Sequence, residues 1–205
     1  MTFVFDLDDT VCDTDGYSEQ YMLNFFREHN MPVNQIAKEV RFAEKKFDWS
    51  DEQAKAWYKT FGDQMMLEFP CKKNALEVIN SLYYQGHRIV IATARADDWH
   101  TEPAKMTQLW LEKVGLKYSK LYVGRIDKEV ICDEEHADIF VDDDIKITGR
   151  VAQTFKRQDG KKSILMTTSY NKNLPLADEV ERIDDFDCFA DYLKKYGVVL
   201  HLKDE

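Results

Sequence analysis

The chain has 205 residues, 44% hydrophobic and 32% charged, which is typical of a globular protein with one sizeable core and room for a small accessory domain. The formal net charge of -10 argues against a nucleic-acid surface, because such a surface usually carries a basic stripe. The apolar runs are short, and no basic and then hydrophobic leader opens the sequence, so we expect a cytoplasmic protein that does not bind membranes.

The chain begins with an apolar run that leads into a cluster of acids, TFVFDLDDT. An apolar run followed by polar residues is typical of a buried strand that ends in a turn. Asp6, Asp8 and Asp9 are therefore predicted to lie at the carboxyl end of a strand. Open parallel sheets bind their ligands at such ends, which makes this acidic turn the first candidate site.

A predicted helical block over residues 15–70 follows the first strand. Apolar side chains recur there at helical intervals and predict three helices, the last of which ends at Pro70. The residues that carry the three patterns are Tyr17, Tyr21, Phe25 and Phe26, then Ile36, Val40 and Phe47, then Trp57, Phe61, Met65 and Phe69.

From residue 71 onward, predicted helices alternate with predicted strands. The helices cover 72–85, 102–114, 145–157 and 184–196, and the strands cover 87–93, 119–123, 138–142 and 162–167. A short helix near Lys128 precedes the strand 138–142, and residues 168–178 read as a polar loop. Strands separated by helices form a parallel sheet with right-handed crossovers. The predicted fold class is α/β, a three-layer sandwich with a parallel sheet and a small helical insertion after the first strand.

The four cysteines are scattered, at Cys12, Cys71, Cys132 and Cys188. They form no C-x-x-C pair and have no histidine cluster beside them, so the sequence predicts neither a zinc site nor a disulfide framework.

Polar residues follow three of the predicted strands, where parallel pairing would bring them to one edge of the sheet. They are Asp6 and Asp8, then Thr93 with Arg95, then Asp142, Asp143 and Asp144, with Lys128 as a further candidate. Carboxylates from two strand ends repel one another unless a cation lies between them. Oxygen ligands without a nearby histidine or cysteine are suited to Mg²⁺.

Asp6 and Asp8 stand two residues apart on an extended segment and lean to the same side, so one can bind the metal and attack while the other handles a proton. A carboxylate that attacks phosphorus forms an acyl phosphate and divides one hard displacement into two easier ones. Phosphoryl transfer also needs charge neutralisation, which Mg²⁺, Lys128 and the Thr93 hydroxyl would provide.

The ordered motifs DLDDT, IATAR, a lysine and VDDD resemble the four motifs of the haloacid dehalogenase-like superfamily. This resemblance implies a Rossmann-like core over residues 1–14 and 71–205 with a cap domain over 15–70. It implies Asp6 as nucleophile, Asp8 as general acid and then base, Thr93 and Lys128 as phosphate ligands, and Asp142, Asp143, the Asp6 carboxylate and the Asp8 backbone carbonyl as magnesium ligands. Ala94 and Arg95, beside Thr93, are further candidates for substrate or phosphate binding.

The resemblance also bears on the reaction and the substrate. The dehalogenases and ion-pumping ATPases of the superfamily lack a carboxylate at the place of Asp8, so the acid implies a phosphohydrolase or, less often, a phosphomutase. A cap excludes water and favours a small phosphorylated metabolite. The core is most similar to the 5'(3')-deoxyribonucleotidase group, which makes a nucleoside monophosphate the leading substrate. Two alternatives stay open: a phosphatase of a sugar or polyol phosphate, and a protein of the same fold that binds phosphorylated ligands without turnover.

Four assignments have rival interpretations. Asp144 is either a third acid of the metal site or, as we favour, the N-cap of the following helix. Lys105 competes with Lys128 but falls inside a predicted helix. Arg95 would contact phosphate or hydrogen-bond its own loop. The segment KEVRFAEKKFDW would either hold a base and a phosphate or, as we favour, present one charged and one packed face.

Overall fold

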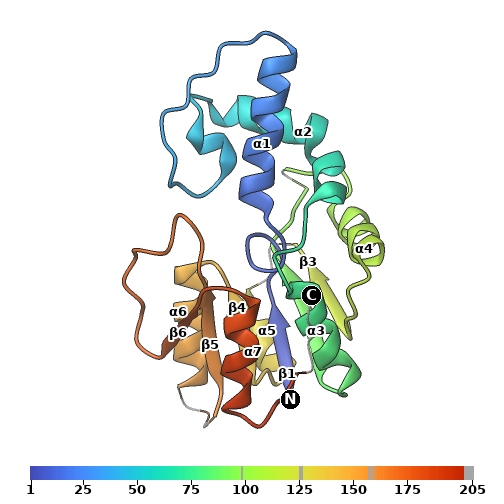
Figure 1. The fold of residues 1–205 in the computed structure, drawn as a ribbon, viewed down its shortest axis with the longest axis vertical. Helices are drawn as coiled ribbons and strands as arrows, with labels where there is room; N and C mark the ends of the chain where they lie inside the picture. Colours follow the sequence, from blue (N-terminus) through green and yellow to red (C-terminus); the bar gives the residue numbers. More distant parts are fainter. Residues whose placement is uncertain (98, 125–126, 157, 159, 201–205) are drawn as a thin grey trace.

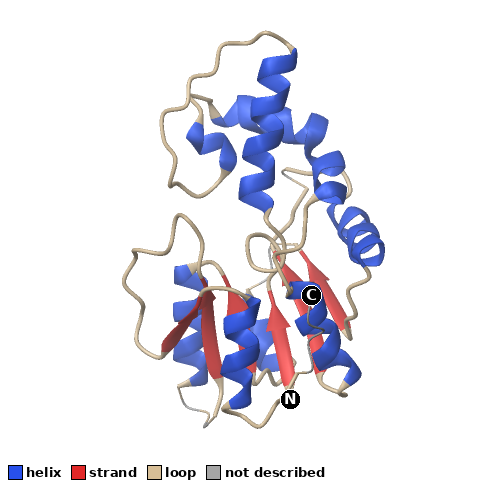
Figure 2. Ribbon diagram, in the orientation of Figure 1, coloured by secondary structure: helices blue, strands red, loops and turns tan. Residues whose placement is uncertain are grey.

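A computed structural model, described for residues 1–97, 99–124, 127–156, 158 and 160–200, shows an α/β core and a helical lobe (Figure 1). We define the helical lobe as residues 14–69. Figure 2 shows that all strands lie in the core, whereas the lobe contains only helices and loops.

The core contains a six-stranded sheet in which every described pairing is parallel. Its order is β3-β2-β1-β4-β5-β6. The strands are β1 Thr2–Phe5, β2 Arg88–Thr93, β3 Lys120–Val123, β4 Ile139–Asp142, β5 Lys162–Met166 and β6 Val180–Ile183. The chain runs outward from β1 in both directions, so the order reverses between β1 and β4, where open sheets of this kind form a crevice at their carboxyl ends.

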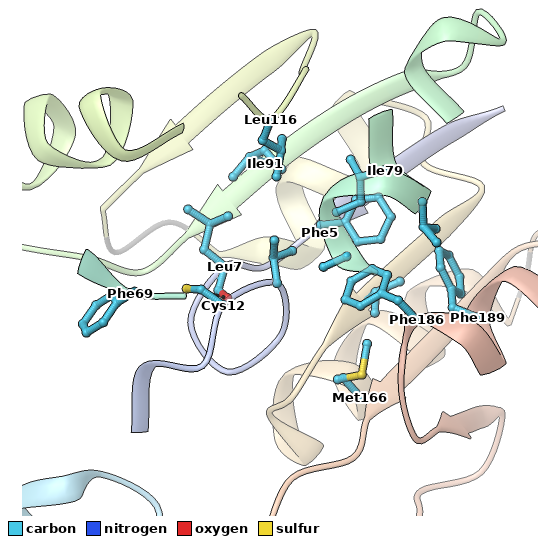
Figure 3. Packing of buried hydrophobic residues seen from close by; sticks show 14 of the residues in the cluster. Phe5, Leu7, Cys12, Phe69, Ile79, Ile91, Leu116, Met166, Phe186 and Phe189 are labelled. Carbon is cyan, nitrogen blue, oxygen red and sulfur yellow. Dashed lines mark hydrogen bonds between the residues drawn. The ribbon is translucent and has the colours of Figure 1, made fainter. Parts of the chain in front are cut away.

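Helices cover both faces of the sheet. They are α3 Ala75–Tyr84, α4 Pro103–Val114, α5 Lys128–Glu134, α6 Ile145–Phe155 and α7 Phe186–Lys194. Side chains alternate along β1, so Phe3 and Phe5 pack against α3 and α7, while Val4 packs with residues of α5 and α6. Figure 3 shows Phe5 among Ile79, Phe186 and Phe189 on the first face. The three-layer α/β prediction is confirmed.

The helical lobe is built on α1 Thr14–Glu28 and α2 Asp51–Glu68. Asp13 caps α1 by accepting a hydrogen bond from the Gly16 backbone N–H, and a reciprocal capping box between Ser50 and Gln53 begins α2. The lobe has an aromatic core, in which the Trp57 ring contacts the rings of Tyr21, Phe25, Phe26, Trp49 and Phe61. The lobe lies beyond the carboxyl end of β1 (Figure 1).

The predicted helix on Ile36, Val40 and Phe47 is wrong. Residues 31–42 form irregular chain, and only Ala43–Lys46 make a short 3₁₀ helix, η1. The helical spacing of these apolar residues gave a wrong prediction because they do not share a buried face. Ile36 is 60% exposed, whereas Phe47 is buried. Strand β6 was missed, since its sequence VERI carries two charged residues within four.

The other predicted elements agree with the structure apart from a few residues at their ends. No helix in the described part of the chain is both long and apolar enough to cross a membrane.

Candidate functional site

The register of the paired strands brings the candidate acids to one edge of the sheet. Phe5 pairs with Ile91 on β2 and with Val141 on β4, so the chain leaves all three strands at the same level. The Asp6 N–H donates to the Val141 carbonyl at 3.0 Å, which extends the pairing by one residue and sets Asp6 beside Asp142. The carboxyl ends of β1, β2 and β4 therefore converge where the strand order reverses.

Asp6, Asp142 and Asp143 form a buried acidic cluster. Each offers a carboxylate oxygen, and these oxygens lie within 4.8 Å of one another. The side chains are at most 7% exposed. An oxygen-only donor set held this closely fits a hard divalent cation such as Mg²⁺, so these are the residues that could hold one.

Lys128 lies at the start of α5 and contacts this cluster directly. Its ammonium group donates to Asp6 Oδ1 at 2.5 Å and to Asp142 Oδ2 at 2.7 Å. The rival, Lys105, lies on α4 with a 60% exposed side chain and pairs with Glu102. Of the two lysines, only Lys128 is next to the acids.

Burial dominates the electrostatics of the cluster. It raises the pKa of Asp6 well above its ordinary value; Lys128 opposes the rise, and the charges of Asp142 and Asp143 add to it. Burial, followed by the charge of Asp142, raises the pKa of Asp143 to about 7. Carboxyl groups that are this costly to ionise together favour a bound cation.

Asp143 also contacts residues that the sequence did not single out. The Tyr170 hydroxyl donates to Asp143 Oδ2 at 2.5 Å and also lies 3.1 Å from Asp9 Oδ2. Asn171 donates to the Asp143 carbonyl at 2.9 Å. Both follow β5 in the stretch that the sequence predicted as a polar loop. Their position after the carboxyl end of a strand is the sequence feature that could have identified them as site residues.

Arg41 reaches the same carboxylate from the helical lobe. Its guanidinium lies 3.4 Å from Asp143 Oδ2 and also pairs with Asp144. The Arg41 side chain is 36% exposed, whereas that of Asp143 is fully buried. The lobe segment KEVRFAEKKFDW thus contributes a cation to the edge of the acidic cluster, whereas its pairing with Asp143 and Asp144 was not predicted.

Asp8 faces a different set of donors. Arg95 forms a side-on pair with both of its oxygens, and the hydroxyls of Thr14 and Thr93 donate to it at 2.8 and 3.2 Å. Burial alone would raise the pKa of Asp8, but the charge and hydrogen bonds of Arg95 outweigh burial and lower it to about 2. Arg95, predicted as a phosphate ligand or a loop anchor, is thus paired with the second acid of DLDDT.

Asp9 and Asp144 hold the two loops of the site in shape. Asp9 has φ +58°, and its carboxylate accepts from the Asp15 N–H at 2.8 Å. Asp144 accepts from the backbone N–H groups of Lys146 and Ile147, which confirms its prediction as the N-cap of α6.

A cleft of about 580 Å³ separates the acidic edge of the sheet from the helical lobe. The residues around it include Asp6, Asp8, Ala94, Arg95, Trp99 and Lys128 from the core and Arg41, Phe42 and Lys45 from the lobe. The lobe segment 38–49 therefore has some side chains in the interior of the lobe and others at the cleft. Lys46 is buried between Asp15 and Glu19, and Phe47 and Trp49 pack on Phe26, whereas Arg41, Phe42 and Lys45 line the cleft.

Comparisons with known proteins find the fold but no close relative. No profile of a known protein family matches the chain, and no curated protein matches it. Among solved structures, the HAD-hydrolase YfnB from Bacillus subtilis, bound to magnesium, has a TM-score of 0.60 at 14% identity and covers 94% of this chain and 98% of its own. The chain has the haloacid dehalogenase-like fold.

Two further solved structures have a similar fold. A predicted phosphatase from Clostridium acetobutylicum has a TM-score of 0.60 at 15% identity, covering 95% of this chain and 98% of its own. The D,D-heptose 1,7-bisphosphate phosphatase from Burkholderia thailandensis has a TM-score of 0.55 at 15% identity, covering 94% and 97%. At these identities the similarity establishes the fold alone.

Proposed function

We propose that the protein is a Mg²⁺-dependent phosphomonoester hydrolase that works through an aspartyl phosphate on Asp6. The observation that carries this proposal is the meeting of Asp6, Asp142, Asp143 and Lys128 beside the cleft, which Asp6 and Lys128 line. The carboxylate oxygens of the three acids suit Mg²⁺, and the haloacid dehalogenase-like fold supports the reaction class by analogy.

Each residue then has one task. Asp6 attacks phosphorus, and the resulting acyl phosphate is later split by water. Asp8 gives a proton to the leaving oxygen in the first step and takes one from the attacking water in the second. Lys128, the Thr93 hydroxyl and the backbone at Ala94 bind the phosphoryl oxygens. Mg²⁺ bound by Asp6, Asp142, Asp143 and the Asp8 carbonyl would supply neutralising charge.

We propose the helical lobe as the cap domain over this site, in line with the cap predicted over residues 15–70. A cleft of about 580 Å³ accommodates a small metabolite, and the leading substrate is a nucleoside monophosphate, for which Phe42 and Trp99 provide aromatic surface at the cleft. The alternative is a sugar or polyol phosphate, which is the substrate class named for one structural neighbour, the D,D-heptose 1,7-bisphosphate phosphatase.

The test is phosphate release from deoxy- and ribonucleoside monophosphates and from sugar and polyol phosphates, with Mg²⁺ and with chelator. Asp6→Asn is the matched control, because it keeps the side-chain shape and removes the nucleophilic charge. We expect metal-dependent release from nucleotides that the variant lacks. Activity confined to sugar or polyol phosphates would select the alternative, and equal rates in the variant would refute the mechanism.

A further inference from the structure

The Arg95 guanidinium is enclosed by the protein. Only 2% of its side chain is exposed. Nε donates to Asp8 Oδ2 at 3.0 Å and Nη2 to Asp8 Oδ1 at 2.7 Å, while Nη1 donates to the Thr107 hydroxyl at 3.4 Å. Nη2 also lies 3.6 Å from the Cys12 sulfur. Each guanidinium nitrogen thus already has a protein partner.

Two aromatic rings limit the movement of this group. The Arg95 guanidinium carbon lies 5.7 Å from the centre of the Phe69 ring and 5.8 Å from that of Trp110. Trp110 is itself fixed, since its indole N–H donates to the Phe69 carbonyl at 2.9 Å. An arginine held in this way would have to break its pair with Asp8 to reach a phosphoryl oxygen.

The same contacts determine how the Asp8 carboxylate is oriented. A side-on pair with an arginine fixes the plane of a carboxylate. Oδ1 accepts the shorter bonds, from Arg95 at 2.7 Å and from Thr14 at 2.8 Å. Oδ2 accepts longer ones, from Arg95 at 3.0 Å and from Thr93 at 3.2 Å. Oδ2 therefore lies beside the hydroxyl that we propose to bind phosphate.

We propose that Arg95 is the positioning residue of Asp8 and not a phosphate ligand, and that Asp8 Oδ2 is the oxygen that transfers the proton; this rests on the proposed function. In the first step, the Asp6 oxygen forms a bond to phosphorus, the bond from phosphorus to the leaving oxygen breaks, and a proton that the phosphomonoester monoanion has brought to Oδ2 passes to that oxygen. In the second step, Oδ2 takes a proton from water as the water oxygen bonds to phosphorus and Asp6 departs.

The test is Arg95→Lys, which keeps the charge but cannot form the side-on pair. We expect kcat to fall by about 10-fold or more, with KM and the inhibition constant of inorganic phosphate changed less than about threefold. The matched control is Arg88→Lys, because Arg88 pairs through Nε and Nη2 with Glu135 at the opposite end of β2. Its kinetics should equal those of the wild type.

Arg95→Lys is also made in an Asp8→Asn background. If Arg95 acts through Asp8, the double variant is no slower than Asp8→Asn alone. Additive losses would overturn the proposal. A tenfold weaker inhibition by phosphate at unchanged kcat would overturn it too, as would wild-type kinetics in Arg95→Lys.

Circular dichroism establishes whether the variant folds. If Arg95→Lys does not fold, Arg95→Gln takes its place, because it also removes the side-on pair with Asp8; the same separation of kcat from phosphate inhibition is expected, and unchanged kcat would overturn the proposal. A wild-type protein that releases no phosphate from any substrate refutes the proposed function itself. An active wild type with an unaffected Arg95→Lys refutes only the positioning role.

Discussion

The two walls of the cleft differ in how firmly their charged groups are held. On the core side, Lys128 pairs with both Asp6 and Asp142, and the three side chains are each at most 7% exposed. On the lobe side, Arg41 is 36% exposed, and Lys45 pairs with Asp51 with half or more of each side chain exposed. Buried, mutually bonded groups are pre-organised for chemistry, whereas half-exposed ones form weak and replaceable contacts. We therefore expect the core to determine the reaction and the lobe to determine the substrate.

The largest effect is expected from Lys128→Met. It leaves Asp6 and Asp142 without their shared cation, so turnover should fall on the order of 100-fold or more. The free energy of unfolding, measured in urea with chelator, should fall by about 3 kcal/mol, because buried charges lose their partner. Lys105→Met removes an exposed lysine and is the control; an equal loss there would contradict the assignment.

A smaller effect on the core wall is expected from Tyr170→Phe. The change removes the hydroxyl that holds Asp143 Oδ2 and should weaken Mg²⁺ binding by about 10-fold. The readout is the rise in melting temperature as Mg²⁺ is titrated, which does not depend on turnover. Tyr122→Phe removes a similar bond to Glu135, far from the acids, and should leave the titration unchanged. Equal Mg²⁺ affinity in wild type and Tyr170→Phe would refute this role.

On the lobe wall, Arg41→Gln should act on substrate binding more than on chemistry. We expect KM to change by about 3- to 10-fold and kcat by less, since the contact is half-exposed. Lys172→Gln breaks another pair between core and lobe, that of Lys172 with Glu39, which lies outside the residues that line the cleft. It should change neither constant. If Arg41→Gln lowered kcat as much as Lys128→Met does, the two walls of the cleft would not have separate roles in chemistry and in substrate binding.

The smallest effect on activity is expected from Glu135→Gln, remote from the cleft. Burial would raise the pKa of Glu135, but hydrogen bonds from Lys120, Tyr122 and Arg88 outweigh it and lower the pKa from 4.5 to about 2. A lowered carboxyl pKa stabilises the fold above the unfolded value and loses that stabilisation as the pH falls toward the folded value.

The wild type should therefore melt about 2–4 °C above Glu135→Gln at pH 7, and the gap should close as the pH falls from about 4.5 toward 2. Melting temperatures across this range are the measurement. A gap that widens on acidification would contradict the sign.

Local patterns were sufficient for the elements whose signal lies within a few residues. The run TFVF before the acids predicted β1, and Asp144 before an apolar periodic stretch predicted the cap of α6. The spacing of Ile36, Val40 and Phe47 imitated a helix because periodicity does not reveal whether the positions share a buried face. Strand β6, with the sequence VERI, was hidden because two of its four residues are charged.

Apart from β6 and the helix wrongly expected over residues 36–47, the sequence by itself determined the order of strands and helices. It also determined the acids at the ends of β1 and β4 and the choice of Lys128 as a candidate, since these depend on local propensity and motif order. Only the tertiary structure decided the partner of each charged side chain. Arg95 meets Asp8, Tyr170 meets Asp143, and Arg41 crosses from the lobe to Asp144. These partners are 87, 27 and 103 residues apart, and only the packing of the whole chain brings them together.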